Sequence, residues 1–134
     1  MDDCPFCAII RGDADAWIVH ETPTALAFFA TGPAAEYHTL VVPKRHHADL
    51  FAIPPDEWLG VAAAVKDVAD LYRERLGIEN VEVLNHSGEH AQQDVFHLHV
   101  HILPRYEGDG QDTSWTDHPE IEKRFDALLG ALKA

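Results

Sequence analysis

The feature that most constrains the fold of this chain is a run of three histidines at alternate positions, His97, His99 and His101, closed by Pro104. Alternation is the period of a β-strand, so the three imidazoles share one face and the apolar residues between them can enter a core on the other. Pro104 has no N–H for a sheet ladder and is expected to end the strand. Three imidazoles in register predict a chemical role, because Thr, Lys or Glu would serve on a face that is merely solvated.

The composition indicates a single globular domain spanning residues 1–134, of which 46% are hydrophobic. No apolar run approaches the length of a membrane span, and the acidic start Met1-Asp2-Asp3-Cys4 lacks the basic region of a signal peptide. We therefore expect a cytoplasmic protein. The formal net charge of −13 argues against nucleic-acid and anionic-membrane partners, yet it allows a small anionic ligand in a locally positive pocket.

Hydrophobic periodicity predicts an α+β domain. Strands are expected at residues 16–20, 25–29, 38–43 and 78–84, in addition to the histidine strand. A helix of about twenty residues begins at Pro54-Pro55 and stops at Gly77. A short helix is expected to continue through residues 8–11 and to end near Gly12, and a last helix is expected to start near Asp117 and Pro119. Apolar residues at steps of three and four predict the core stripe of the long helix, namely Trp58, Val61, Val65, Val68, Tyr72 and Leu76.

Cys4 and Cys7 form a Cys-x-x-Cys motif, which can indicate a zinc site, a redox pair or chance. A redox pair usually follows a strand, and only three residues precede Cys4, so zinc is favoured. A closed Cys₂His₂ site would take both thiolates, one of His46 and His47 from the basic patch 44–47, and one strand histidine. Such a site is structural, because it leaves no position for water.

A single catalytic zinc held by all three strand histidines is disfavoured by distance. Same-face residues on a strand step by about 6.6 Å, so the outer two lie roughly 13 Å apart, whereas zinc sits about 2 Å from each ligand nitrogen. The three histidines are therefore expected to have different tasks. An imidazole outside the metal site can attack phosphorus, and a second one can protonate the leaving group.

The run His97–Leu103 resembles the signature of the histidine-triad (HIT) family, and the resemblance extends through Cys4-Pro5-Phe6-Cys7, residues 25–46 and residues 85–96. It implies an α+β HIT-like fold, with a five-stranded antiparallel sheet, one long helix and N- and C-terminal helices. It also implies a nucleotide hydrolase or transferase acting at the α-phosphate of a small purine nucleotide, usually as a homodimer with a continuous sheet.

The resemblance also implies residue roles. His99 would become nucleotidylated, His101 would contact the phosphate or leaving group, and His97 would orient the strand. The metal set would be Cys4, Cys7, His46 and His97, and the nucleotide-binding residues would be Asn85, Gln93, Asp94, His38 and Phe28.

Two positions depart from the family pattern. Ala30 stands where many members have an aspartate for the ribose hydroxyls, and Asp94 stands where some members have Ser or Thr. The first departure supports an alternative, a nucleotide- or partner-binding module with little catalysis. A zinc hydrolase using the histidine strand is a third reading.

Overall fold

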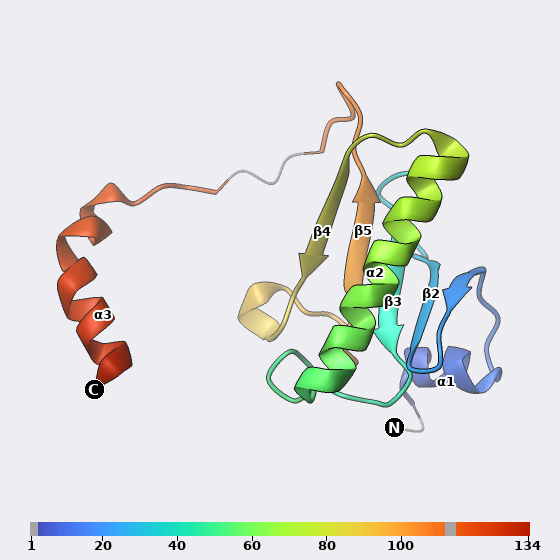
Figure 1. The fold of residues 1–134 in the computed structure, drawn as a ribbon, viewed down its shortest axis with the longest axis horizontal. Coiled ribbons are helices and arrows are strands. Elements are labelled where there is room, and N and C mark those ends of the chain that lie inside the picture. The colour runs from blue at the N-terminus through green and yellow to red at the C-terminus, as the bar shows by residue number, and fades with distance from the viewer. Residues whose placement is uncertain (1–2, 112–114) are drawn as a thin grey trace.

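The protein, described here from a computed structural model covering residues 3–111 and 115–134, is built on one five-stranded antiparallel sheet with strand order β1-β2-β3-β5-β4 (Figure 1). The predicted α+β class and five-stranded sheet are confirmed. The strands are β1 (Ile18–Glu21), β2 (Ala25–Phe29), β3 (Thr39–Pro43), β4 (Val81–Asn85) and β5 (Val100–Pro104). The helices are α1 (Pro5–Arg11), α2 (Pro55–Leu76) and α3 (Phe125–Lys133), with the 3₁₀ helices η1 (Glu89–Ala91) and η2 (Pro119–Arg124).

Helix α2 covers one face of the sheet. It begins with Pro55 and two acidic residues in its first turn, and it ends at Gly77, whose φ of 69° is the left-handed conformation that glycine adopts without a steric cost. Its buried side chains are Val61, Ala64, Val68 and Tyr72. The predicted stripe is therefore correct along most of its length, but Leu76 is exposed because it lies in the last turn, beyond the packed part of the helix.

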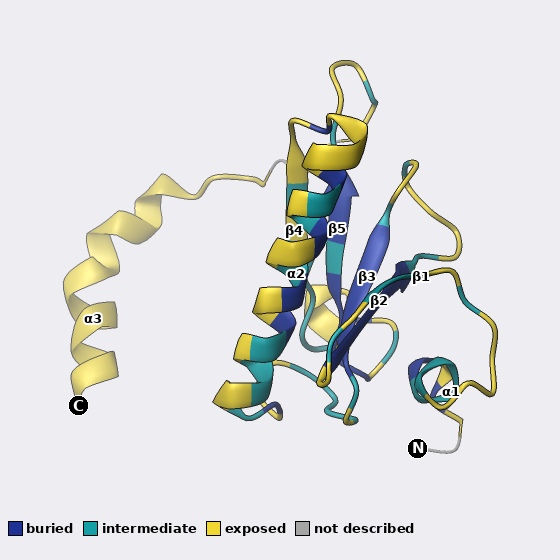
Figure 2. Cartoon of the chain, turned by 45° about the vertical axis from the view of Figure 1, so that its right-hand side comes forward, coloured by how far each residue is buried: buried dark blue, intermediate teal, exposed yellow. Residues whose placement is uncertain are grey.

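The opposite face of the sheet carries the histidines and is covered in part by α1. Leu26, Phe28, Leu40 and Val42 pack there against Cys4 and Phe6. Strands β2 and β3 are consequently buried on both faces, as the dark blue central strands in Figure 2 show. The short N-terminal helix thus closes a second, smaller core next to the imidazoles.

The paired part of the histidine strand begins later than predicted, at Val100. Before it, the backbone N–H of Leu98 donates to the carbonyl of His47, at 2.7 Å, outside the sheet ladder. The predicted alternation still holds. Leu98, Val100 and Ile102 belong to the core beneath α2, and the three histidines occupy the other face.

Arg105, just after β5, forms ion pairs that hold the start of the C-terminal segment against the sheet. This guanidinium donates to Asp109 and Glu82, both at 2.8 Å, and these hydrogen bonds raise the pKa of Arg105 and lower the pKa of Asp109. The predicted C-terminal helix exists as α3, but residues 115–134 are all exposed, and α3 stands apart from the sheet in Figure 1. Its apolar residues Phe125, Leu128, Leu129 and Leu132 therefore face solvent. Within the described residues, no helix has the length and apolar content needed to cross a membrane.

Candidate active site

The fully buried His97 is fixed in one tautomer by the end of β3. Its Nε2–H donates to the carbonyl oxygen of Pro43 at 2.9 Å, so Nδ1 carries the lone pair. Burial lowers its pKa to about 4, which keeps the ring neutral at physiological pH. A neutral imidazole with a fixed, free Nδ1 is the form that binds a metal.

Nδ1 of His97 points into a cluster of four potential metal ligands, Cys4, Cys7, His46 and His97, whose donor atoms lie within 4.8 Å of one another. Sγ of Cys4 and Sγ of Cys7 are each 3.5 Å from Nδ1 of His97, and Sγ of Cys7 is 3.4 Å from Nδ1 of His46. A tetrahedral zinc with ordinary bond lengths requires sulfur–nitrogen separations of about 3.6 Å. The four residues therefore fit a metal ion with little movement.

The choice between the two neighbouring histidines of the basic patch is resolved by geometry. His46 joins the cluster, whereas Nε2 of His47 lies 2.9 Å from Oε1 of Glu57 at the start of α2. The cations of the patch are also paired, Lys44 with Glu21 at 2.6 Å and Arg45 with Glu57 at 3.3 Å. The patch thus supplies one potential metal ligand, His46, and its other side chains pair with carboxylates of β1 and α2.

His99 is held with the opposite tautomer. Its Nδ1–H donates to the backbone carbonyl of His97 at 2.9 Å, and this leaves the lone pair on Nε2. The ring is buried at its sides, edge-on to Phe6 with centroids 5.1 Å apart and edge-on to His101 at the same distance. An imidazole oriented by its Nδ1–H, with Nε2 on the far side of the ring from that hydrogen bond, has the arrangement of a nitrogen nucleophile.

His101 belongs to a hydrogen-bonded chain that starts at a backbone amide. The N–H of Ala34 donates to Nδ1 of His38 at 3.0 Å, so the proton of His38 is on Nε2. Nε2 of His38 lies 3.0 Å from Nδ1 of His101 and must donate to it. The remaining proton of His101 is therefore on Nε2, and burial together with the neighbouring histidines lowers the pKa of this ring to about 4. His101 can offer a neutral N–H donor beside His99.

Two side-chain amides secure the backbone around His99. Nδ2 of Asn85, on β4, donates to the carbonyl of His99 at 3.0 Å, and its oxygen accepts from Ser87 at 2.8 Å. Gln93 is buried and ties the preceding loop together, donating to Ala48 at 2.6 Å and accepting from the Gly88 amide at 2.7 Å. Both amides already have protein partners, and so do both ring nitrogens of His38.

A cavity of about 230 Å³ lies beside the Phe6 ring and is lined by aromatic and aliphatic side chains, including Phe28, Phe29 and Leu40. It equals about eight times the ~30 Å³ that one water occupies in the liquid, which is enough for a nucleobase. Phe28 is itself buried and edge-on to Phe6, with centroids 5.6 Å apart. Ala30 offers no carboxylate here, but Thr31 and Asp15 line the same cavity.

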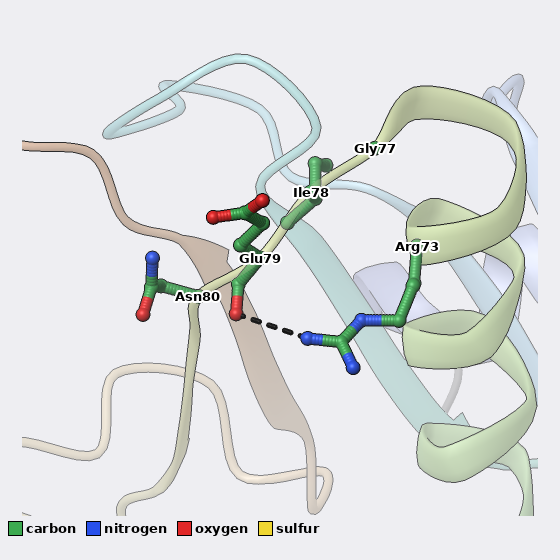
Figure 3. Close-up of a pocket in the computed structure, with 5 residues that line it drawn as sticks. All are labelled: Arg73, Gly77, Ile78, Glu79 and Asn80. Carbon is green, nitrogen blue, oxygen red and sulfur yellow. Dashed lines mark hydrogen bonds between the residues drawn. The ribbon is translucent and has the colours of Figure 1, made fainter.

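A different hollow, of about 540 Å³, lies at the C-terminal end of α2 (Figure 3). It is lined by Arg73, Gly77, Ile78, Glu79 and Asn80, and the Arg73 guanidinium donates to the Glu79 carbonyl at 3.3 Å. This lining contains no histidine or cysteine. The hollow lies at the turn from α2 to β4, and its lining residues give it no group comparable to the imidazoles on the other face.

A family model described as the HIT domain matches residues 11–108, which include the imidazole row and all five described strands. The chain belongs to the HIT family. A HIT-like protein of Methanocaldococcus jannaschii, described as uncharacterised, is 41% identical over 97% of this chain and 98% of its own length. An adenosine 5'-monophosphoramidase of Schizosaccharomyces pombe is 33% identical over 93% of this chain and 92% of its own length.

Solved structures agree with this fold. The crystal structure of a HIT family protein from Bacillus anthracis matches with a TM-score of 0.89 and 32% identity, over 98% of this chain and 96% of that one. A Zn-bound histidine-triad protein from Mycobacterium smegmatis matches with a TM-score of 0.78 and 35% identity, over 98% and 96% of the two chains. The likeness covers the whole HIT domain, including most of the C-terminal segment.

The structure brings the predicted metal ligands together in one cluster, places His99, His101 and His38 in one row of imidazoles, and places Phe28 on the wall of the cavity. Asn85 and Gln93 hold the backbone around this row, and Asp94 lies beside His99. Sequence reasoning gave no role to Phe6 or His86. Phe6 packs against both His97 and His99, and His86 lies 5.6 Å from His101, ring centre to ring centre. A usable signal was that Phe6 is the one aromatic residue inside the Cys-x-x-Cys motif, and a large apolar side chain next to two metal ligands favours burial, whereas its neighbour Pro5 is exposed.

Proposed function

We propose that this HIT protein hydrolyses or transfers nucleotides at the α-phosphate, through a covalent nucleotidyl-His99 intermediate. The observation that carries the proposal is the free Nε2 lone pair of His99, fixed by the hydrogen bond from Nδ1–H to the His97 carbonyl. The HIT family contains a named adenosine monophosphoramidase, which supports the reaction class. The substrates we propose are nucleoside phosphoramidates or dinucleoside polyphosphates.

The chemistry takes two displacements. In the first, Nε2 of His99 bonds to the α-phosphorus while the bond from phosphorus to the leaving nitrogen or oxygen breaks. Nε2–H of His101 donates a hydrogen bond to the leaving atom, which takes its proton from solvent water, because a neutral imidazole does not release its single N–H proton. In the second, water attacks the nucleotidyl-histidine, gives a proton to the solvent and releases the nucleoside monophosphate. The relay from Ala34 through His38 holds His101 in the tautomer that both steps need.

We propose that the purine nucleoside occupies the cavity beside Phe28 and that Asn85, Gln93 and His38 act mainly by holding the reactive imidazoles in place. Their side-chain partners within the protein support positioning over direct nucleotide contact. The cluster of Cys4, Cys7, His46 and His97 would hold a structural zinc, which would fasten α1, and with it Phe6, against His99. A metal with four protein ligands has no open position for substrate.

We also propose a homodimer. β4 is an edge strand with Val81 and Val83 exposed at 39% and 48%, and α3 presents an uncovered apolar side. A nine-residue helix is unstable alone in water, so α3 needs a surface to pack on. A second copy of this chain would cover both surfaces, and a long open edge with apolar side chains favours pairing over solvation.

The alternative function, a nucleotide- or partner-binding module with little catalysis, is favoured by one observation. Ala30 has no carboxylate for the ribose hydroxyls, and losing a charge-assisted hydrogen bond of that kind weakens binding by about 1.5–3 kcal/mol. Isothermal titration with AMP beside a turnover assay separates the two functions, because tight binding with no turnover supports the module.

The test of the proposed function is His99→Ala assayed on a panel of nucleoside phosphoramidates and dinucleotides, with mass spectrometry of the wild-type protein for a nucleotide on His99. We expect the variant to lose turnover while its fold and metal content are unchanged. His20→Asn is the matched control, because His20 contacts Asp67 on the opposite, α2-covered side of the sheet. Full activity in His99→Ala, or a modified residue other than His99, would show the proposal to be wrong.

A further inference from the structure

Asp94 lies directly in front of the nitrogen that would attack phosphorus. Its Oδ1 is 3.5 Å from Nε2 of His99, and the same oxygen accepts a hydrogen bond from the Val95 amide at 2.8 Å. The side chain is 82% exposed, whereas that of His99 is 4% exposed. The carboxylate therefore stands at the mouth of the site, close to where the α-phosphate must enter, and it can swing outward without disturbing the core.

The surroundings of Asp94 reinforce its negative charge. A hollow of about 380 Å³ beside it also contains Asp3, and the cavity behind Phe6 contains Asp15. The large hollow of about 1030 Å³ next to Asn85 and His86 is lined by Asp117 and by Glu82, whose charge is balanced by Arg105 at 2.8 Å. No lysine or arginine is among the described residues that line these three hollows.

The cations of the basic patch 44–47 and Arg105 are paired with other carboxylates. Lys44 is paired with Glu21, and Arg45 is paired with Glu57 at the start of α2. The formal charge of the whole chain is −13, so the long-range electrostatic field of the protein does not offset the negative charge of Asp94. A substrate approaching His99 thus meets the Asp94 carboxylate, with no lysine or arginine among the described residues that line the neighbouring hollows.

This arrangement treats leaving groups differently according to their charge. In a nucleoside phosphoramidate, the leaving amine adds no negative charge to that of the α-phosphate, and it can be cationic elsewhere. In a dinucleoside polyphosphate, the leaving group carries several further negative charges within a few ångströms of Asp94. Like charges at that distance repel strongly where the dielectric response is weaker than that of bulk water.

We propose that Asp94 is a specificity-determining residue, a charge filter that makes this chain prefer nucleoside phosphoramidates with neutral or cationic amines over dinucleoside polyphosphates. The inference rests on the proposed function and narrows its substrate class. In the preferred reaction, the Nε2–phosphorus bond forms and the phosphorus–nitrogen bond breaks. The electron pair goes to the amine, which accepts a hydrogen bond from Nε2–H of His101 and takes its proton from solvent water, and a second water later releases the monophosphate.

The test compares kcat/KM for adenosine 5'-phosphoramidate and for diadenosine tetraphosphate in the wild-type protein, Asp94→Asn and Glu74→Gln. Asp94→Asn keeps the shape of the side chain and removes its charge. Glu74→Gln changes the net charge by the same amount on an exposed part of α2, on the other face of the sheet. We expect the preference for the phosphoramidate to fall about tenfold in Asp94→Asn, the effect of one screened charge pair, and to stay within twofold of wild type in Glu74→Gln.

The salt dependence of the substrate preference distinguishes an electrostatic role of Asp94 from a purely structural one, which would not depend on ionic strength. Raising ionic strength from about 20 mM to about 200 mM shortens the screening length severalfold, so it should raise kcat/KM for the tetraphosphate in the wild-type protein relative to Asp94→Asn. Turnover by the wild-type protein with an unchanged preference in Asp94→Asn would overturn the inference alone. Absence of both turnover and a nucleotidyl-His99 in the wild-type protein would overturn the proposed function and the inference with it.

Discussion

Removing the metal from the Cys4, Cys7, His46 and His97 cluster should destabilise the domain by a predictable amount. Helix α1 has only seven residues and cannot persist on its own, and its one buried apolar residue is Phe6. The donor atoms are already at the separations of a tetrahedral site, so little reorganisation opposes binding. Free zinc at about a thousand times its dissociation constant then contributes about 4 kcal/mol to the free energy of unfolding.

For a domain of 134 residues, each kcal/mol shifts the melting temperature by about 3 °C, so chelation should lower Tm by about 12 °C. The assay is thermal unfolding followed by circular dichroism, with and without EDTA, beside elemental analysis of the purified protein. Cys4→Ser is the internal control, because it should start at the lower Tm and respond little to EDTA. Activity measured at a temperature where the stripped protein remains folded should persist, since the four protein ligands leave the metal no catalytic position.

The reasoning would be refuted by a protein that contains no stoichiometric metal when zinc is supplied and whose Tm does not move on chelation. The short sulfur–nitrogen distances would then be thiol–imidazole hydrogen bonds. An immediate loss of turnover on chelation, without unfolding, would instead favour the zinc-hydrolase reading.

Two further predictions concern pH and assembly. His101 has a pKa of about 4 in the folded protein, against about 6.5 in the unfolded chain, so its contribution is fully present above pH 6.5 and is lost as pH falls toward 4. Linkage predicts that this shift lowers the free energy of unfolding by about 2 kcal/mol between pH 7 and pH 5. Urea titrations should therefore find that the free energy of unfolding depends less on pH in His101→Gln than in the wild-type protein. Equal pH dependence in the two proteins would contradict the pKa assigned to His101. Light scattering should find a dimer, which Val83→Lys at the β4 edge or truncation before η2 should weaken, whereas a monomeric wild-type protein would exclude the proposed assembly.

The sequence predicted the site well where a local repeat or a spacing determines geometry. The alternation of the histidines placed His97, His99 and His101 on one face, and the Cys-x-x-Cys spacing indicated the cluster that the structure assembles. Both patterns are short, and the regular geometry of a strand or a helical turn determines the distances between their side chains.

Other features could not be predicted because they depend on partners far away in the sequence. The tautomers of the imidazoles are determined by carbonyls and amides at Pro43, His97 and Ala34, which only the folded backbone brings near. The cations of the basic patch are neutralised by Glu21 and Glu57, which come from two other elements. The sequence predicted a C-terminal helix but not its position apart from the sheet.

If the proposed dimer forms, the exposed helix α3 would report its assembly. An exposed amphipathic helix is stabilised by the surface that covers it, so protease cleavage there should depend on protein concentration while the sheet stays resistant. Limited proteolysis at several protein concentrations, followed on a gel, would then show faster loss of the C-terminal helix in dilute protein.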